Sequence, residues 1–397
     1  MTPAIRQYAI ITGNYWAFTL TDGALRMLVV LHFYALGYSP LAIAMLFLFY
    51  EFFGVVTNLV GGWLGARIGL NRTMNIGLAV QVAALLMLAV PAEWLTVLWV
   101  MVAQALSGIA KDLNKMSAKS SIKMLVPKDA QGSLYKWIAI LTGSKNTLKG
   151  VGFFLGAGLL ALLGFKGAVL TMAGALSGVA VLSLFLLQAD LGKAKGKPKF
   201  TEIFSKDERV NRLSAARVFL FGARDIWFVV ALPVYMSSQL GWSSWLVGGF
   251  MACWVIGYGV VQGFAPRITA VGNSGAVPDG RVALGWGLIL AFVPAMLALS
   301  LYVSDEVVIG LVLGLMVFGV LFAVNSSLHS YLIVAYAKED GVSMDVGFYY
   351  MANAAGRLLG TVLSGWVYQV WGLEACLLIS ACMIALAAFV ARPLPRP

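Results

Sequence analysis

Charged residues that could bind an anion lie inside the apolar runs of this sequence. The stretch SKNTLKG places Lys145 and Lys149 between two strongly apolar segments. Residues four apart share one face of a helix, where two like charges repel each other unless an anion joins them. A charged residue at the centre of a membrane helix costs about 2.5–3.5 kcal/mol, so it needs a partner or a purpose. We therefore interpret the two lysines as part of an anion-binding site.

Four other apolar runs bring ionisable residues to the same expected depth. The bases among them are Arg26, Arg224 and Arg357. The acids are Asp22, Glu51 and Asp225. With the two lysines, the bases outnumber the acids, which predicts a positive site suited to phosphate or carboxylate oxygens. Four asparagines could supply further polar contacts in such a site: Asn14, Asn146, Asn325 and Asn353.

Several of these charges also have structural interpretations. Asp22 and Arg26 stand at i and i+4, so an ion pair within one helix is as consistent with their spacing as binding is. Glu51 is more consistent with neutralising a lysine on a neighbouring helix than with proton coupling. The carboxylates that nevertheless leave room for proton exchange are Asp22, Glu51, Asp112 and Asp225. For Lys145, Lys149 and Arg224, binding is favoured over structure.

Other charged residues lie nearer the ends of their runs. Lys111, Lys115 and Lys119 follow at i, i+4 and i+8, which gives one basic helix face. The lysines that we interpret as contacts to lipid headgroups are Lys111, Lys119, Lys123 and Lys136. Arg217 and Arg224 stand seven apart and share a face.

Composition places these residues in a membrane protein. The chain has 397 residues, of which 60% are hydrophobic and 11% charged, and its mean hydropathy is +0.87. A soluble domain has about 25% charged residues. Twelve apolar runs are each long enough to span a bilayer: 12–37, 40–66, 73–91, 94–117, 133–163, 167–189, 213–238, 243–266, 281–302, 307–335, 345–371 and 373–392. The sequence therefore predicts an all-α polytopic membrane protein with twelve transmembrane helices.

Loop charges predict the orientation. Eighteen Lys and Arg residues fall in the loops and tails expected on one side, against only Lys166 on the other. By the positive-inside rule, both termini are cytoplasmic. The net charge of +11 then reflects orientation and headgroup contact rather than nucleic-acid binding. No Cys/His cluster suggests a metal, no cofactor motif is present, and no nucleophile–base pair indicates an enzyme.

The long basic loop 191–212 divides the runs six and six, so we predict an N-terminal six-helix bundle over 1–190, a linker over 191–212 and a C-terminal six-helix bundle over 213–397. Aligning Gly164 with Gly372 places Lys149 over Arg357. When LGYSP (36–40) is aligned with its repeat LGWSS (240–244), Asp22 falls within one position of Asp225. Two parallel six-helix repeats joined by a basic cytoplasmic loop resemble the major facilitator superfamily. The loop GGWLGARIGLNRT is similar to the signature of that superfamily, with alanine in place of the usual acidic residue.

A closer resemblance covers nearly the whole chain. It is carried by NYWAFTLTDGALRMLVVLHF, FLFYEFFGVVTNLVGGWL, LSGIAKDLNKMSAKSSIK, ILTGSKNTLKGVGFFLG and ARVFLFGARDIWFVV, which are similar to the bacterial organoarsenical efflux permeases of the ArsJ family. The resemblance implies a bacterial inner-membrane transporter that exports 1-arseno-3-phosphoglycerate and so confers arsenate resistance. It also implies a metabolic partner, the glyceraldehyde-3-phosphate dehydrogenase that makes this compound from arsenate.

The intramembrane charges and the family resemblance lead to one hypothesis for the site. Lys145 and Lys149 would hold one anionic end of the cargo, while Arg26 and Arg224 hold the other. The expected protein is a monomer that works by alternating access. An organophosphate–phosphate exchanger, or another organic-anion transporter of the superfamily, is the main alternative. A lipid-handling role also stays open, because a basic cavity could accept an anionic headgroup.

Overall fold

The computed structural model describes residues 3–38, 46–127, 130–187, 191–196, 198–269, 277–303 and 307–397. Within these residues the regular structure is helical, which confirms the all-α prediction. Lys128 and Lys197, counted above among the cytoplasmic bases, lie outside the described residues, as does the start of the predicted run 40–66.

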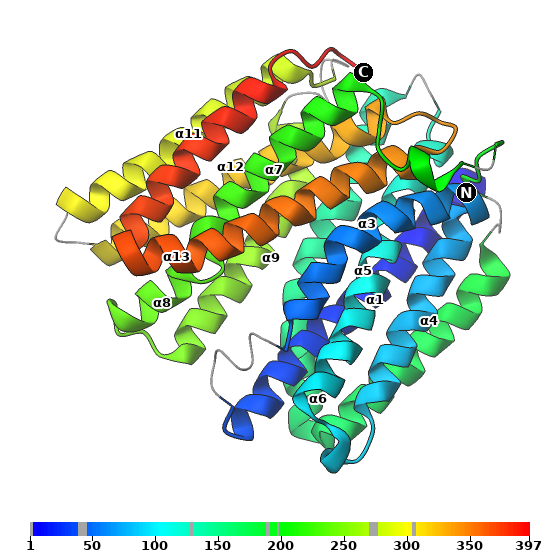
Figure 1. The fold of residues 1–397 in the computed structure, drawn as a ribbon, viewed down its shortest axis with the longest axis horizontal. Helices are drawn as coiled ribbons and strands as arrows, with labels where there is room; N and C mark the ends of the chain where they lie inside the picture. The colour runs from blue at the N-terminus through cyan, green and yellow to red at the C-terminus, as the bar shows by residue number, and fades with distance from the viewer. Residues whose placement is uncertain are drawn as a thin grey trace. The chain divides into compact units, whose positions relative to one another are not determined.

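The long helices follow the apolar runs (Figure 1). They are α1 (Pro3–Ala35), α3 (Leu48–Ile68), α4 (Leu70–Leu88), α5 (Val97–Leu125), α6 (Gln131–Leu186), α7 (Glu208–Phe228), α8 (Ala231–Ser238), α9 (Ser244–Ile268), α11 (Gly280–Val303), α12 (Val307–Tyr336) and α13 (Val342–Ala391). Two short 3₁₀ turns cover Ala92–Trp94 and Phe200–Glu202. Six helical stretches in the described part of the chain are long and apolar enough to cross a membrane.

The helices α6 and α13 each contain a break at a glycine. Gly164 has φ 66° and ψ 178°, and Gly372 has φ 81° and ψ −174°. A positive φ is accessible to glycine at no steric cost, so the chain can leave one helix and enter the next there. The helices α6 and α13 therefore each cover two of the predicted apolar runs. The two glycines that align in the sequence also share the same backbone feature.

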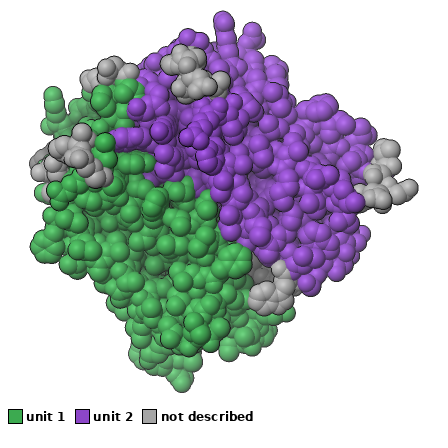
Figure 2. All heavy atoms as spheres, turned by 180° about the vertical axis from the view of Figure 1, so that it is seen from behind, with its two compact units in different colours: residues 1–130, 144–204, 337–351 green, residues 131–143, 205–336, 352–397 purple. Residues whose placement is uncertain are grey.

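The chain forms two compact units, coloured separately in Figure 2. Unit 1 comprises residues 1–130, 144–204 and 337–351, and unit 2 comprises residues 131–143, 205–336 and 352–397. Each unit thus includes one short segment from the other half of the sequence. The division of the sequence at the linker 191–212 stays a prediction.

Unit 1 has its core between α1, α4, α5 and the second part of α6. Phe18, Leu25, Leu78 and Phe165 are among its buried side chains. The helices α1 and α6 cross closely, because a Cβ atom on Gly152 would lie 2.8 Å from the carbonyl oxygen of Leu20. At the same crossing, a Cβ atom on Gly23 would lie 2.6 Å from the carbonyl oxygen of Lys149.

Unit 2 has an aromatic core between α7, α9 and α12. The ring of Trp227 lies edge-on to Phe318 at 4.9 Å and to Trp254 at 6.4 Å. The helices α7 and α13 cross at Gly222 and Gly360, where a Cβ atom on Gly360 would lie 2.6 Å from the Gly222 carbonyl oxygen. The crossing places α13 directly beside Asp225, whose Cβ would lie 3.0 Å from a Cβ atom on Gly360.

Candidate functional site

A buried carboxylate joins two arginines in unit 2. Asp225 on α7 is fully buried, and its Oδ1 accepts from Nε of Arg224 at 2.6 Å. Its Oδ2 accepts from Nε of Arg357 on α13 at 3.1 Å. The carboxylate therefore holds two guanidinium groups from different helices in fixed positions, and Arg357 keeps 32% of its side chain exposed.

A third arginine belongs to the same group. Nε of Arg217 donates to Oδ1 of Asn353 at 2.8 Å, and Nη1 to the Ser326 carbonyl at 3.4 Å. The Phe221 ring contacts two guanidiniums, that of Arg217 at 3.7 Å and that of Arg224 at 5.0 Å from its centroid. The shared face that the spacing of these two arginines predicted is therefore observed on α7. We call Arg217, Arg224, Asp225, Asn353 and Arg357 the arginine cluster.

The charge of the arginine cluster favours an anion. Two of its three guanidiniums pair with one carboxylate, and the other direct partners named above are neutral oxygens and an aromatic ring. Guanidinium groups bind phosphate and carboxylate oxygens through paired hydrogen bonds. Such a group held by a buried carboxylate is already oriented before a ligand arrives.

Unit 1 has a second buried aspartate, flanked by lysines. Asp112 on α5 has 2% of its side chain exposed, and its Oδ1 accepts from Nζ of Lys115 at 2.5 Å. Nζ of Lys111 lies 3.9 Å from Oδ2. Both lysine side chains are only 13–14% exposed.

Two tyrosines complete this group. Nζ of Lys119 donates to the Tyr350 hydroxyl, and it lies 4.8 Å from the centroid of the Tyr350 ring. Nζ of Lys115 lies 4.7 Å from the same ring, and Nζ of Lys111 lies 3.8 Å from the Tyr50 ring. We call Lys111, Asp112, Lys115, Lys119, Tyr50 and Tyr350 the lysine cluster.

The interpretation of Lys111 and Lys119 as headgroup contacts is wrong. Lys119 is 3% exposed, and α5 continues to Leu125 rather than ending near residue 117. The stripe at i, i+4 and i+8 faces into unit 1 because the aspartate and the tyrosine rings offset its charge there. Lys136, by contrast, is exposed on α6.

The charged residues of α1 and α3 interact across these two helices. Nη2 of Arg26 lies 3.3 Å from Oε1 of Glu51, and the Tyr50 hydroxyl donates to Oδ1 of Asp22 at 2.7 Å. The guanidinium of Arg26 also lies 4.7 Å from the Tyr50 ring. Glu51 therefore pairs with Arg26, and its pairing with a lysine of a neighbouring helix stays a prediction. Tyr50 thus contacts Asp22 through its hydroxyl and both Arg26 and Lys111 through its ring.

The lysines of SKNTLKG are half-buried on α6 in unit 1. Nζ of Lys145 lies within hydrogen-bond distance of Oδ1 of Asn146, at 3.2 Å. Lys149 marks the α1–α6 crossing, since a Cβ atom on Gly23 would lie 2.6 Å from its carbonyl oxygen. Gly23 is next to Asp22, so the crossing brings the backbone of Lys149 beside the acid of α1. Binding of an anion by the two lysines stays a prediction.

Two predicted asparagines make contacts typical of helix packing. Asn14 donates to the Ser183 hydroxyl at 2.8 Å. Asn325 donates to the carbonyl oxygens of Trp286 and Leu321 at 3.0 and 2.9 Å. Asn353 differs from both, because it contacts a charged group of the arginine cluster.

Sequence reasoning left several residues of the two clusters out of the candidate site. These are Tyr50, Lys111, Lys115, Lys119, Arg217 and Tyr350. The available signal was the pattern KDLNKMSAK, in which an aspartate follows the first lysine of a stripe with helical spacing. An acid beside a row of lysines indicates that the residues are buried together and offset each other's charge. Lysines that contact lipid headgroups need no such acid.

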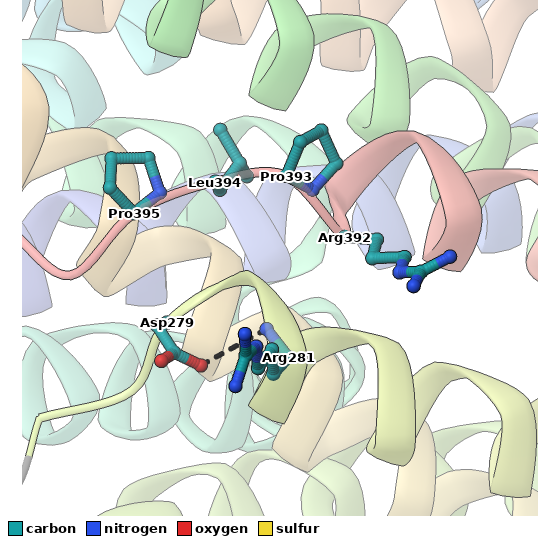
Figure 3. A pocket seen from close by; sticks show the side chains of 6 residues that line it. All are labelled: Asp279, Arg281, Arg392, Pro393, Leu394 and Pro395. Atoms are coloured by element: carbon teal, nitrogen blue, oxygen red, sulfur yellow. Dashed lines mark hydrogen bonds between the residues drawn. The ribbon is translucent and has the colours of Figure 1, made fainter.

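A separate pocket of about 690 Å³ opens in unit 2, where α11 begins (Figure 3). It is lined by Asp279, Arg281, Arg392 and Pro393–Pro395. Asp279 caps α11 by accepting from the N–H groups of Arg281 and Val282. Because Arg281 and Arg392 are both exposed, the pocket suits contacts with anionic headgroups better than an occluded cargo.

The comparisons with known proteins concern the whole chain. The sequence profile of the Major Facilitator Superfamily matches residues 11–278 and 228–397. No curated protein sequence matches. The human organic anion transporter MFSD10 (TETRAN) is similar in structure, with TM-score 0.78, 16% identity, and coverage of 98% of this chain and 100% of that one.

Two sugar symporters are also similar in structure. A single-residue variant of the E. coli fucose:proton symporter FucP gives TM-score 0.73 at 13% identity, covering 98% of this chain and 99% of that one. The proton:xylose symporter XylE, bound to 6-bromo-6-deoxy-D-glucose, gives TM-score 0.75 at 13% identity, covering 99% and 96%. These matches confirm the predicted fold with its two helical bundles.

Proposed function

We propose that the chain, which belongs to the major facilitator superfamily, exports a small organic dianion, and specifically 1-arseno-3-phosphoglycerate. Members of this superfamily are transporters, and the membrane-length helices make this chain a multi-pass membrane protein. The observation that carries the proposal is the arginine cluster, in which two guanidiniums share one buried carboxylate and a third is held by an asparagine. A cluster with this charge attracts an anion and disfavours a cationic drug.

The proposed cargo fits the chemistry of both clusters. It carries a phosphate at one end and an arsenate ester at the other, and both groups present oxygens to guanidinium or ammonium donors. The resemblance to the ArsJ family supplies the arsenical, and the similarity to an organic anion transporter supports the charge class. With both termini in the cytoplasm, an inside-negative potential favours anion export by about 2.3 kcal/mol per charge per 100 mV.

The experiment measures arsenate resistance and retained arsenic in cells with and without the chain. The cells carry a glyceraldehyde-3-phosphate dehydrogenase, and a parallel strain lacks it. We expect protection only when both proteins are present. Arg224→Ala and Lys149→Ala should lose it, while Lys136→Ala, an exposed lysine of α6, should keep it at equal expression.

Two other outcomes would contradict the proposal. Protection without the dehydrogenase would exclude the arsenylated phosphoglycerate as the cargo. A chain that gives no protection but exchanges labelled glycerol phosphate for phosphate in proteoliposomes would be an organophosphate–phosphate exchanger.

A further inference from the structure

The start of α11 and the segment that follows α13 are joined by close backbone contacts in unit 2. The N–H group of Gly280 donates to the carbonyl oxygen of Leu394 at 2.9 Å. A Cβ atom on Gly280 would lie 2.6 Å from the carbonyl oxygen of Arg392. Leu394 is buried at this junction. The walls of the 690 Å³ pocket, which these two chain segments supply, are therefore held together by the backbone (Figure 3).

The pocket has a positive lining. Arg281 comes from the first turn of α11, and Arg392 follows α13 directly. In the part of the chain that the structure describes, their N–H groups donate to Asp279 and Phe389, and both side chains are exposed. The guanidiniums can therefore approach a ligand from two different elements.

The one carboxylate of the lining is already engaged. Oδ1 of Asp279 accepts from the N–H groups of Arg281 and Val282 at 3.0 and 3.1 Å. Its Oδ2 accepts from Nε of Arg396 at 3.4 Å. Arg396 thus offsets the charge of Asp279, and the lining arginines leave the pocket positive. A positive concavity of this size attracts a small anionic group, and guanidiniums bind phosphate oxygens through paired hydrogen bonds.

Each lining arginine is at the end of a row of exposed apolar side chains. On α11, Ile289 and Phe292 follow Arg281 at helical spacing, and they are 55% and 64% exposed. On α13, Phe389 stands three residues before Arg392 and is 55% exposed. A phospholipid has the same order of groups, with a phosphate at the end of its acyl chains. A soluble phosphate has no apolar part to place against such side chains.

The two apolar rows belong to helices that pack against each other. About two turns into α11, a Cβ atom on Gly287 would lie 2.6 Å from Cβ of Ala388 on α13. Both helices are in unit 2. The contact keeps α11 beside α13 over the length that the acyl chains would cover.

We propose that this pocket binds the phosphate group of an anionic phospholipid between Arg281 and Arg392, with the acyl chains along the exposed apolar rows of α11 and α13. Both arginines are in loops and tails predicted to face the cytoplasm, where the inner leaflet carries anionic headgroups. The bound lipid joins the start of α11 to the end of α13 and stabilises this end of unit 2. The site is separate from the arginine cluster and does not depend on the identity of the cargo.

The test is a calorimetric titration of the purified full-length protein in an uncharged detergent. The probes are short-chain phosphatidylglycerol, phosphatidylcholine of the same chain length, the headgroup glycerophosphoglycerol without acyl chains, and inorganic phosphate. We expect phosphatidylglycerol to bind about tenfold or more tightly than either soluble anion, because its acyl chains add apolar contact. Phosphatidylcholine should bind more weakly, since its cationic choline faces the arginines.

Substitutions assign the binding to the pocket. Arg281→Gln and Arg392→Gln should each weaken binding of phosphatidylglycerol by about fivefold, the usual contribution of one arginine beside an anionic headgroup. Arg281→Lys keeps the charge and should lose less. Arg267→Gln is the matched control, because it removes an exposed arginine near the end of α9 that does not line the pocket. It should leave the affinity unchanged.

Three results would overturn the proposal. Equal losses for Arg267→Gln and Arg281→Gln would indicate diffuse attraction to a basic surface. Inorganic phosphate or the headgroup alone binding as tightly as the lipid, with the same dependence on Arg281, would indicate a site for soluble phosphate. Binding of phosphatidylcholine as tight as that of phosphatidylglycerol would exclude selection by charge. Thermal unfolding without lipid checks that each variant is folded. If Arg281→Gln is not, the comparison of Arg392→Gln with Arg267→Gln decides.

Discussion

The two units each place one buried aspartate between two basic residues, but they surround it differently. Asp225 in unit 2 holds Arg224 and Arg357, whereas Asp112 in unit 1 holds Lys111 and Lys115. In the arginine cluster, the third base is held by an asparagine and a backbone carbonyl. In the lysine cluster, it is held by a tyrosine. The same charge pattern is thus built once with rigid forks and once with flexible point charges.

The difference suits the two clusters to different roles in the proposed function. Arginines fixed by a carboxylate lose little freedom when a ligand binds, so we propose that the arginine cluster orients one anionic group of the proposed cargo. Lysines pack their aliphatic stems and can redirect the ammonium, so the lysine cluster can exchange one partner for another. If this comparison holds, the two aspartates and the two sets of bases should respond differently to substitution, whereas the two helix crossings should respond alike.

Removing the aspartates should give the largest effect and the clearest contrast. Asp225→Asn leaves two guanidiniums from different helices without their shared counterion, and breaking a buried ion pair costs about 3–5 kcal/mol. Since Arg357 is about one-third exposed, we expect a value near the lower end of this range. Asp112→Asn should cost less, because its lysines can move their ammoniums. Thermal unfolding of both purified variants measures the difference. Equal losses would remove the distinction between rigid and flexible clusters.

The glycine crossings should give the next largest effect, and here the units should agree. Gly360→Ala places a methyl group 2.6 Å from the Gly222 carbonyl and 3.0 Å from Cβ of Asp225. Gly152→Ala places one 2.8 Å from the Leu20 carbonyl. Overpacking of this kind costs about 1–3 kcal/mol.

Gly158→Ala is the matched control on α6, because a methyl group there meets nothing within 4 Å. It should be neutral or slightly stabilising in thermal unfolding, since alanine favours the helix more than glycine does. A neutral Gly360→Ala would mean that the α7–α13 crossing is not close, and that the arginine cluster is held by its ion pairs alone.

The sequence predicted the features that depend on local pattern. The apolar runs marked the helices, and the two glycines that align in the sequence, Gly164 and Gly372, are the points where α6 and α13 break. Intramembrane charge was enough to single out Arg224, Asp225 and Arg357, because such residues are rare without a partner or a function.

The features that sequence reasoning missed depend on distant parts of the chain. Lys119 stands at the end of the predicted run 94–117, where a lysine normally reaches the headgroups. Its burial results from the segment 337–351, more than 200 residues away, which brings Tyr350 onto α5. The pattern KDLNKMSAK indicates a buried site, but it does not identify Tyr350 as the partner of Lys119. The partners of Arg26 and Asp22 were missed for the same reason, since both Glu51 and Tyr50 are on another helix.

Tyr50 offers an intermediate test, because it contacts groups of both signs. Its hydroxyl donates to Asp22, and its ring lies beside the cations of Arg26 and Lys111. Tyr50→Phe should cost about 1–3 kcal/mol, as it leaves a buried carboxylate short of a donor. Tyr50→Leu should cost a further 0.5–2 kcal/mol or so through loss of the cation–π contacts. Unfolding measurements on the two variants separate these contributions. If Tyr50→Phe is neutral, Asp22 does not depend on the tyrosine for its stability.

Exchanging the two kinds of base should give the smallest effect, and it tests the division of roles directly. Arg224→Lys keeps the charge beside Asp225 but loses the fork, so we expect affinity for 3-phosphoglycerate to fall about tenfold, or about 1.4 kcal/mol. Lys115→Arg keeps the charge beside Asp112 and adds donors to the lysine cluster. The ammoniums of that cluster need no fixed geometry. Its affinity should change by less than about threefold, or about 0.65 kcal/mol. Calorimetric titration compares the two on the same scale. A larger loss for Lys115→Arg would mean that the lysine cluster, not the arginine cluster, sets the orientation of the anion.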